Sequence, residues 1–207
     1  MGMRVAGYGA VDRTVSVPFR FDGHLMTGHP GDTLASALMA NGVTLMARSF
    51  KYHRPRGVMT AGSTEPNALV EVGEGAARVP NVRATVQELH EGLVAHSQNA
   101  WPALGLDLLA VNDLAAPFLS AGFYYKTFMW PRGFWEKVYE PAIRRAAGLG
   151  SFAREAEPRD YEKAFASCDL LVVGAGPAGL MAALAGAEAG ADVILAEEGT
   201  ALGGRLL

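Results

Sequence analysis

The segment LLVVGAGPAGL, residues 170–180, decides the fold class of the second half of the chain. Its four leading apolar residues predict a strand, and Gly174, Gly176 and Gly179 follow it in the spacing G-x-G-x-x-G. In this pattern the first glycine permits a tight turn, the second lets a pyrophosphate approach the backbone, and the third lets a helix pack on the strand. The segment therefore predicts a strand, a phosphate-binding turn and the start of a helix.

The residues that follow complete a β-α-β unit. Pro177 suits the first helical turn, where its missing N–H costs nothing. The segment ADVILAEEG, residues 191–199, predicts a second strand that ends at Glu197, 23 residues after Gly174. A carboxylate there can accept hydrogen bonds from the ribose hydroxyls of an adenosine, and it disfavours a 2′-phosphate. The unit is therefore typical of a Rossmann domain that binds NAD or FAD rather than NADP.

The helix of this unit is expected to pack through one face, formed by Leu180, Ala183, Leu184 and Ala187. The alternative for the whole unit is a glycine-rich turn inside a buried β-α-β unit that binds nothing. Arg205 is placed either near a phosphate or adenosine, or in an ordinary solvated loop. We predict no catalytic residue and no metal ligand. The candidate cofactor-binding residues are Gly174, Gly176, Pro177, Ala178, Gly179, Glu197, Glu198, Gly204 and Arg205.

Composition limits the class of protein. Of the 207 residues, 50% are hydrophobic and 19% are charged, as in ordinary globular proteins, and the net charge is −3. This charge gives no electrostatic reason to expect nucleic acid or an anionic membrane as a partner. The single cysteine, Cys168, excludes an intrachain disulfide and suits a reducing cytoplasm. The longest uncharged run, residues 170–187, contains Pro177 and several glycines, so we interpret it as strand, turn and helix rather than a membrane span.

The first part of the chain predicts a small mixed α/β domain. Residues 14–21, TVSVPFRF, alternate as a half-buried strand, and Pro18 places that strand at a sheet edge. Asp22-Gly23 predicts a hairpin turn, and HLMT is the returning strand. In GDTLASALMANG, residues 31–42, a helix is capped by Asp32 or Thr33 and ends at Asn41-Gly42. Further strands are expected in residues 43–47 and 68–73, which is the element order of a β-grasp domain.

The middle of the chain differs in character. Residues 88–98, ELHEGLVAHSQ, are expected to be helical, as are residues 140–150. Half of all aromatic residues fall between positions 118 and 139. These rings either pack in a core between domains or form an interface for a missing partner or missing chain.

Residues 48–57, RSFKYHRPRG, interleave basic and aromatic side chains, a pattern found in proteins that bind single-stranded nucleic acids. The run is short and the chain is acidic overall. We therefore interpret it as a structural loop, or as a loop that pairs with acidic groups elsewhere in the chain, and predict no nucleic-acid partner.

Four segments together resemble one family, the alpha subunit of heterotetrameric sarcosine oxidase and its opine, proline and cyanide-forming amine oxidoreductase relatives. They are FRFDGHLMTGHPGDTLASALMANGV, RSFKYHRPRGVMTAGSTEPNALVEV, AGFYYKTFMWPRGFWEKVYEPAIRRAAGLG and the glycine motif with its trailing LGGRLL. The resemblance runs over nearly the whole chain. It implies that the first domain is a β-grasp domain of the 2Fe-2S ferredoxin type.

The same resemblance implies that this domain holds no cluster. Cluster-bearing relatives have cysteines after the R-x-x-G turn, and the matching positions here are Thr60, Glu65 and Ala68. An iron–sulfur cluster needs thiolates, which these residues do not supply. The domain is therefore expected to be a structural relic of a cluster-binding one.

The resemblance also implies a function. The Rossmann domain of this subunit would bind NAD, and FAD and FMN would be held mainly by the beta subunit of a complex with beta, gamma and delta subunits. The reaction would be the oxidative demethylation of sarcosine to glycine and formaldehyde, with oxygen reduced to hydrogen peroxide. A missing C-terminal region would bind tetrahydrofolate. Cytoplasmic localisation is expected.

The chain is expected to be an N-terminal fragment, inactive alone, because only 28 residues follow Gly179. We expect three parts: a β-grasp domain without cluster ligands, a helical aromatic-rich connector, and the start of a Rossmann domain. Two alternatives stay open: an FAD-binding alpha subunit of another secondary-amine dehydrogenase, acting on an opine or proline, and a non-catalytic assembly module. The three parts span residues 1–98, 99–165 and 166–207.

Overall fold

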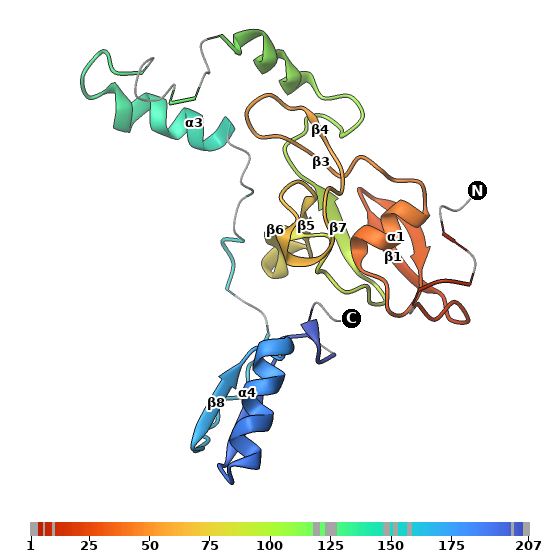
Figure 1. Ribbon diagram of the computed structural model, residues 1–207. Helices are drawn as coiled ribbons and strands as arrows, with labels where there is room; N and C mark the ends of the chain where they lie inside the picture. The colour runs from red at the N-terminus through yellow and green to blue at the C-terminus, as the bar shows by residue number, and fades with distance from the viewer. Residues whose placement is uncertain are drawn as a thin grey trace. The chain divides into compact units, whose positions relative to one another are not determined.

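The chain divides into two compact units, Met1–Pro158 and Arg159–Leu207 (Figure 1). The computed structural model describes residues 4–5, 7–9, 11–117, 121–122, 128–146, 150, 153–156, 159–199 and 201–204.

A mixed five-stranded sheet forms the framework of the first unit. Its strand order is β2-β1-β7-β5-β6, in which β1 and β7 are parallel and the other neighbours are antiparallel. This sheet with a single crossing helix is the expected β-grasp arrangement. The strands are β1 (Val17–Phe21), β2 (His24–Gly28), β5 (Leu69–Val72), β6 (Val79–Arg83) and β7 (Val94–Ser97), and a separate short pair consists of β3 (Ala47–Arg48) and β4 (Pro55–Arg56).

A two-residue turn joins β1 to β2, as predicted. Phe21 pairs with His24, and both turn residues have a positive φ, 47° at Asp22 and 80° at Gly23. Two consecutive positive φ angles define a type I′ turn, whose twist matches that of the flanking strands. The dipeptide therefore fixes the register of the hairpin.

The expectation that Pro18 marks an edge strand is wrong. β1 lies between β2 and β7, so it is an inner strand. The structure tolerates the proline because parallel pairing with β7 starts only at Arg20, and Pro18 uses its carbonyl to accept from the Gly92 amide at 3.1 Å. The missing N–H of Pro18 thus precedes the stretch of β1 that pairs with β7.

The helix α1 (Leu34–Ala40) begins and ends where the sequence predicts. Thr33 is the N-cap, and its side chain and that of Ser36 form a reciprocal capping box. Asp32 is buried and supports the same turn by accepting hydrogen bonds from the Ser36 hydroxyl and the His29 amide. The C-cap residue is Asn41.

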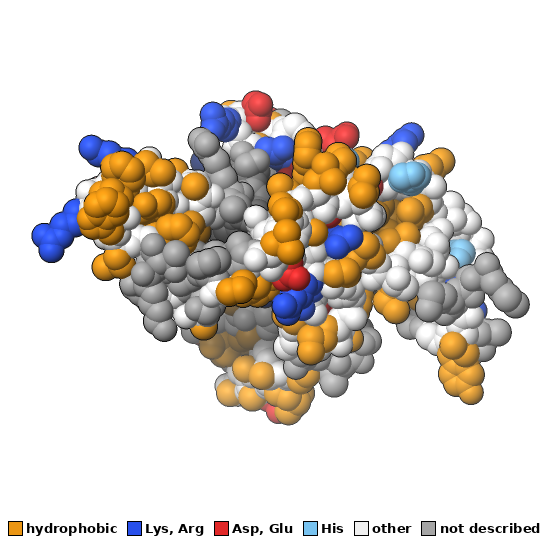
Figure 2. Space-filling view, turned by 90° about the horizontal axis from the view of Figure 1, so that it is seen from above, with side chains coloured by type: hydrophobic (Ala, Val, Ile, Leu, Met, Phe, Trp, Pro, Cys, Tyr) orange, Lys and Arg blue, Asp and Glu red, His pale blue; other side chains and the backbone are white. Residues whose placement is uncertain are grey.

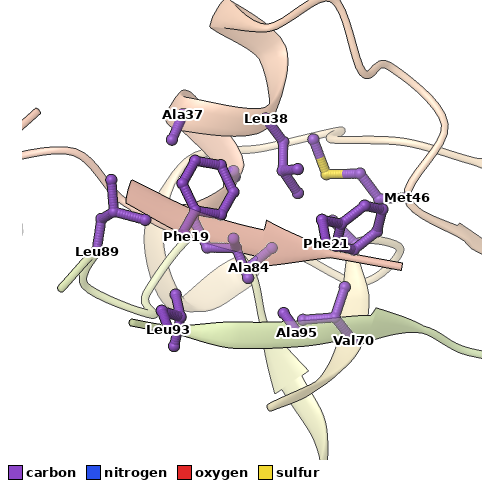
Figure 3. Close-up of a cluster of buried hydrophobic side chains, with 13 residues drawn as sticks. Phe19, Phe21, Ala37, Leu38, Met46, Val70, Ala84, Leu89, Leu93 and Ala95 are labelled. Carbon is purple, nitrogen blue, oxygen red and sulfur yellow. The ribbon is translucent and has the colours of Figure 1, made fainter. Parts of the chain in front are cut away.

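The hydrophobic core of the first unit lies between α1 and the sheet. Figure 3 shows Phe19 and Phe21 of β1 on the side of the sheet that carries Ala37 and Leu38 of α1, with Met46 close by. Burial of such side chains is the main favourable term in folding. The remaining members of the cluster are Leu34, Ala35, Ala68, Val70, Ala84, Leu89, Leu93 and Ala95.

The predicted helix over residues 88–98 is wrong. Residues 94–97 instead form β7, in which Val94 and Ala95 pair in parallel with Arg20 and Phe21. Gly92 has a φ of 76°, which is incompatible with a continuous helix. The partners of β7 lie far away in sequence, so the local pattern did not reveal the strand.

The connector contains short helical segments: η3 (Leu108–Ala115), the π-helical turn η4 (Trp135–Tyr139) and α3 (Glu140–Ala146). Two aromatic pairs of the connector are in contact: the ring centroids of Phe128 and Tyr139 lie 4.9 Å apart, and those of Phe134 and Tyr139 lie 6.2 Å apart. Trp130 is 80% exposed. Figure 2 shows hydrophobic side chains at several places on the molecular surface. Of the nine aromatic residues at positions 118–139, the four at positions 118 and 123–125 lie outside the described residues.

Within the described ranges, no helix has the length and apolarity needed to cross a bilayer.

The second unit contains the predicted β-α-β arrangement. The strands β8 (Leu170–Val173) and β9 (Val193–Ala196) are parallel, and α4 (Pro177–Glu188) connects them (Figure 1). The predicted helix face is half right: Leu180 and Ala183 are partly buried, whereas Leu184 and Ala187 are exposed. The packed face differs from the predicted one because Gly186 lies close to the strands. A Cβ atom at Gly186 would lie 2.7 Å from the Leu170 side chain, so the side of α4 that carries Gly186 packs on β8.

We expect Leu38→Ala to lower the free energy of unfolding of the first unit by about 2–5 kcal/mol, because Leu38 is fully buried in the α1 core. The matched control Leu25→Ala removes a side chain that is 66% exposed, and its effect should stay within about 0.5 kcal/mol. All three tryptophans lie in the first unit, so urea unfolding followed by tryptophan fluorescence measures this unit. Equal effects of the two substitutions would contradict the described core.

Candidate dinucleotide-binding site

Three glycines shape the turn between β8 and α4, each for a different steric reason. Gly174 has a φ of 95°, a conformation that residues with a Cβ rarely adopt. A Cβ at Gly179 would lie 1.8 Å from the Gly174 carbonyl oxygen, so only glycine lets the helix approach the strand this closely. A Cβ at Gly176 would meet no atom within 4 Å, so the space above this residue is open. The turn therefore has the open cradle that a diphosphate requires.

The N-terminus of α4 supplies hydrogen-bond donors to this space. Gly176 is the N-cap, and Pro177 and Ala178 are exposed in the first turn. The first amides of a helix have no acceptor within the helix, and they carry the positive end of its dipole. The Gly174 amide, in contrast, donates to the Ala196 carbonyl at 2.7 Å. The available amides are thus those of Gly176, Ala178 and Gly179.

Glu197 lies directly after β9 and contacts the turn. Its Oε2 accepts from the Ala175 amide at 2.6 Å, and its Oε1 accepts from the Gly199 amide at 2.9 Å. The Gly199 and Ala175 amides, in that order, hold the pKa of the Glu197 carboxyl below its ordinary value. The carboxylate is therefore ionised at neutral pH, and each of its oxygens keeps a further lone pair with which to accept from a hydroxyl.

The segment after β9 returns to the same turn. The Gly203 amide donates to the Ala175 carbonyl at 2.9 Å, and a Cβ at Gly204 would lie 3.1 Å from the Gly176 Cα. Glu198 is exposed beside Glu197. Arg205 lies outside the described residues. The structure thus brings Gly204 and Glu197 to the glycine turn, as the sequence suggested.

Ala175 is central to this arrangement although sequence reasoning did not select it. It is fully buried, its amide is bound by Glu197 and its carbonyl by Gly203. The motif leaves this position unrestricted, because Ala175 makes both contacts through its own main-chain atoms. No side-chain signal could have identified it.

The basic-aromatic loop of residues 48–57 is held by structural contacts. The Arg48 guanidinium donates to the Leu104 carbonyl, at 3.1 Å from Nε and 2.9 Å from Nη2. The buried His53 ring lies 2.7 Å from the Asp107 carboxylate. These contacts agree with the interpretation of this segment as a structural loop.

Two segments of the chain, one in each unit, match protein families. Residues 14–100 match the family described as 2Fe-2S iron-sulfur cluster binding domain, and residues 169–206 match the family described as FAD dependent oxidoreductase. The fold is therefore a ferredoxin-like β-grasp domain followed by a β-α-β unit of the Rossmann type.

Among curated proteins, the chain is 63% identical to the sarcosine oxidase subunit alpha of Rhizobium meliloti, over 99% of this chain and 21% of that protein. It is 32% identical to the subunits of the same name from Corynebacterium strains P-1 and U-96, over 95% of this chain and 16% of those proteins. The chain thus spans about a fifth or less of the length of these relatives. The resemblance to sarcosine oxidase alpha subunits is confirmed.

A solved structure, that of L-proline dehydrogenase from P. horikoshii, aligns with 93% of this chain and 26% of its own, at a TM-score of 0.48 and 21% identity.

We expect Gly179→Ala to destabilise the second unit by about 1–3 kcal/mol, because the added Cβ collides with the backbone at Gly174. The matched control Gly176→Ala places the same methyl group in open space and should cost only about 0.5 kcal/mol, the difference between glycine and alanine at an N-cap. Hydrogen exchange of the amides in residues 169–196, followed by mass spectrometry, measures the difference. Equally fast exchange in the two variants would contradict the described packing of α4 on β8.

Proposed function

We propose that this chain is part of the alpha subunit of a sarcosine oxidase-type complex, which demethylates sarcosine oxidatively to glycine, formaldehyde and hydrogen peroxide. The observation that carries the proposal is the 63% identity over 99% of the chain to an alpha subunit of that name. The ordered succession of a β-grasp domain, a connector and a dinucleotide-type β-α-β unit agrees with it. The same proposal includes the division of the chain into three parts, residues 1–98, 99–165 and 166–207.

Within this subunit, residues 170–204 form the first part of a site for the adenosine diphosphate half of a dinucleotide. The amides of Gly176, Ala178 and Gly179 would bind the diphosphate, where the dipole of α4 favours negative charge. Glu197 would accept hydrogen bonds from the ribose hydroxyls. The open space above Gly176 and the anchored position of the carboxylate support this assignment.

The adenosine diphosphate group is common to NAD and FAD, and these residues recognise that shared part. The family resemblance favours NAD, with FAD and FMN held mainly by the beta subunit. The description of the family matched by residues 169–206 favours FAD. We propose NAD as the first candidate and FAD as the second.

The partners proposed are the beta, gamma and delta subunits, and a region beyond this chain that binds tetrahydrofolate. We propose the cytoplasm as the site of action. A second candidate function is a non-catalytic module for subunit assembly. The exposed Trp130 and Met129 of the connector favour it, because exposed apolar groups are common at interfaces.

The decisive experiment is a chimera in which this chain replaces the matching segment of the R. meliloti alpha subunit. We expect the chimera to bind NAD or FAD, and Gly176→Val to weaken binding by at least about tenfold, because the branched side chain fills the diphosphate space. The matched control Ala182→Val adds the same side chain on the exposed face of α4 and should bind normally.

Calorimetry with each nucleotide separates the two cofactors, and a flavin spectrum of the chimera purified without beta subunit identifies FAD in this site. Absence of both nucleotides, or equal binding by Gly176→Val, would refute the dinucleotide site. If a chimera that binds neither nucleotide still assembles with its partner subunits, that result would favour the second candidate function, a module for subunit assembly.

A further inference from the structure

The iron–sulfur cluster suggested by the family description does not fit the residues of this chain. Such clusters are bound by four cysteines, or by two cysteines and two histidines. The chain has one cysteine, Cys168, which lies outside the matched range of residues 14–100. The loop of residues 57–68 contains neither cysteine nor histidine. No electron-transfer step is therefore assigned to this domain.

A buried carboxylate occupies the centre of that loop. The Glu65 side chain is 1% exposed, and its Oε2 accepts from the amides of Met59 and Thr60, both at 2.7 Å. Its Oε1 accepts from the amides of Asn67 and Ala68, at 2.6 and 3.1 Å. One side chain thus binds main-chain donors from both ends of the loop.

This arrangement supplies acceptors to loop amides that would otherwise be buried without a hydrogen bond. Buried amides without an acceptor cost about 1–3 kcal/mol each, and a loop of irregular backbone cannot satisfy them through a sheet or helix. In a cluster-bearing loop, the cluster sulfurs accept hydrogen bonds and bring negative charge. The Glu65 carboxylate likewise accepts hydrogen bonds and brings negative charge. Thr60 and Ala68 are two of its four donors. They are also the other two positions that the resemblance aligns with cluster cysteines.

We infer that the Glu65 carboxylate replaces the iron–sulfur cluster as the internal anion that holds this loop closed. Burial of the carboxylate raises its pKa, but the amides of Thr60, Asn67, Met59 and Ala68 together lower it below its ordinary value. The group is therefore charged at neutral pH. The inference is independent of the dinucleotide site in the second unit.

The test compares the full chain with Glu65→Gln. A glutamine keeps the shape of the side chain, but it removes the charge and turns a donor NH₂ group toward two donor amides. We expect exchange of the amides in residues 57–70 to become about ten- to a hundredfold faster, measured by mass spectrometry. The control Glu74→Gln makes the same change at an exposed glutamate of the same domain and should leave exchange unchanged.

Two further measurements test the inference even if Glu65→Gln does not fold. Glu65→Asp keeps the charge but shortens the side chain, and its exchange should lie between that of the native chain and that of Glu65→Gln. The native chain, incubated anaerobically with ferrous iron and sulfide and then desalted, should retain no iron. Native exchange rates in Glu65→Gln, or stoichiometric iron and sulfide in the native chain, would overturn the inference.

Discussion

The close contact between the start of α4 and the end of β8 determines what the second unit can do. Because Gly179 has no side chain, the helix lies directly against the Gly174 carbonyl. This contact fixes the position of the first helical turn against the strand, and the space above Gly176 stays open. A helix held farther from the strand would tilt, and its dipole would no longer point at one small volume. The proposed diphosphate site is thus a consequence of backbone packing.

Two carboxylates organise the two units in the same physical way. Glu197 binds the turn amide of Ala175, and Glu65 binds four amides of the loop in the first unit. In each case a charged acceptor satisfies main-chain donors that neither a helix nor a sheet can satisfy. The difference lies in exposure, since Glu65 is buried while Glu197 remains accessible to a ligand. Glu65 is therefore suited to a structural role, and Glu197 is suited both to a structural role and to ligand recognition.

A ferredoxin-type domain without a cluster has a limited range of roles. Its residues do not supply the thiolate ligands of an iron–sulfur cluster, but its sheet and the core around Phe19 and Leu38 have the β-grasp arrangement. Such a domain can still present loops and exposed residues to other parts of an assembly. This agrees with its proposed place in a multi-subunit oxidase, in which the chemistry is carried out elsewhere.

Features with a local cause could be predicted from the sequence. The Asp22-Gly23 turn, the capped helix after Thr33 and the glycine motif each depend on neighbouring residues, and the structure has all three elements. Strand β7 was missed because its pairing with Arg20 and Phe21 joins residues more than 70 positions apart. The role of Glu65 was missed because it depends on amides, which the sequence does not show. Of the candidate site, the glycine positions and Glu197 could be predicted, but Ala175 could not.

A crystal structure of an alpha subunit that contains this chain, with its nucleotide bound, would show directly whether the first turn of α4 binds a dinucleotide diphosphate. We expect phosphate oxygens within hydrogen-bonding distance of the Gly176, Ala178 and Gly179 amides, and a ribose in contact with Glu197. A nucleotide bound elsewhere, with the space above Gly176 filled by protein side chains, would contradict it.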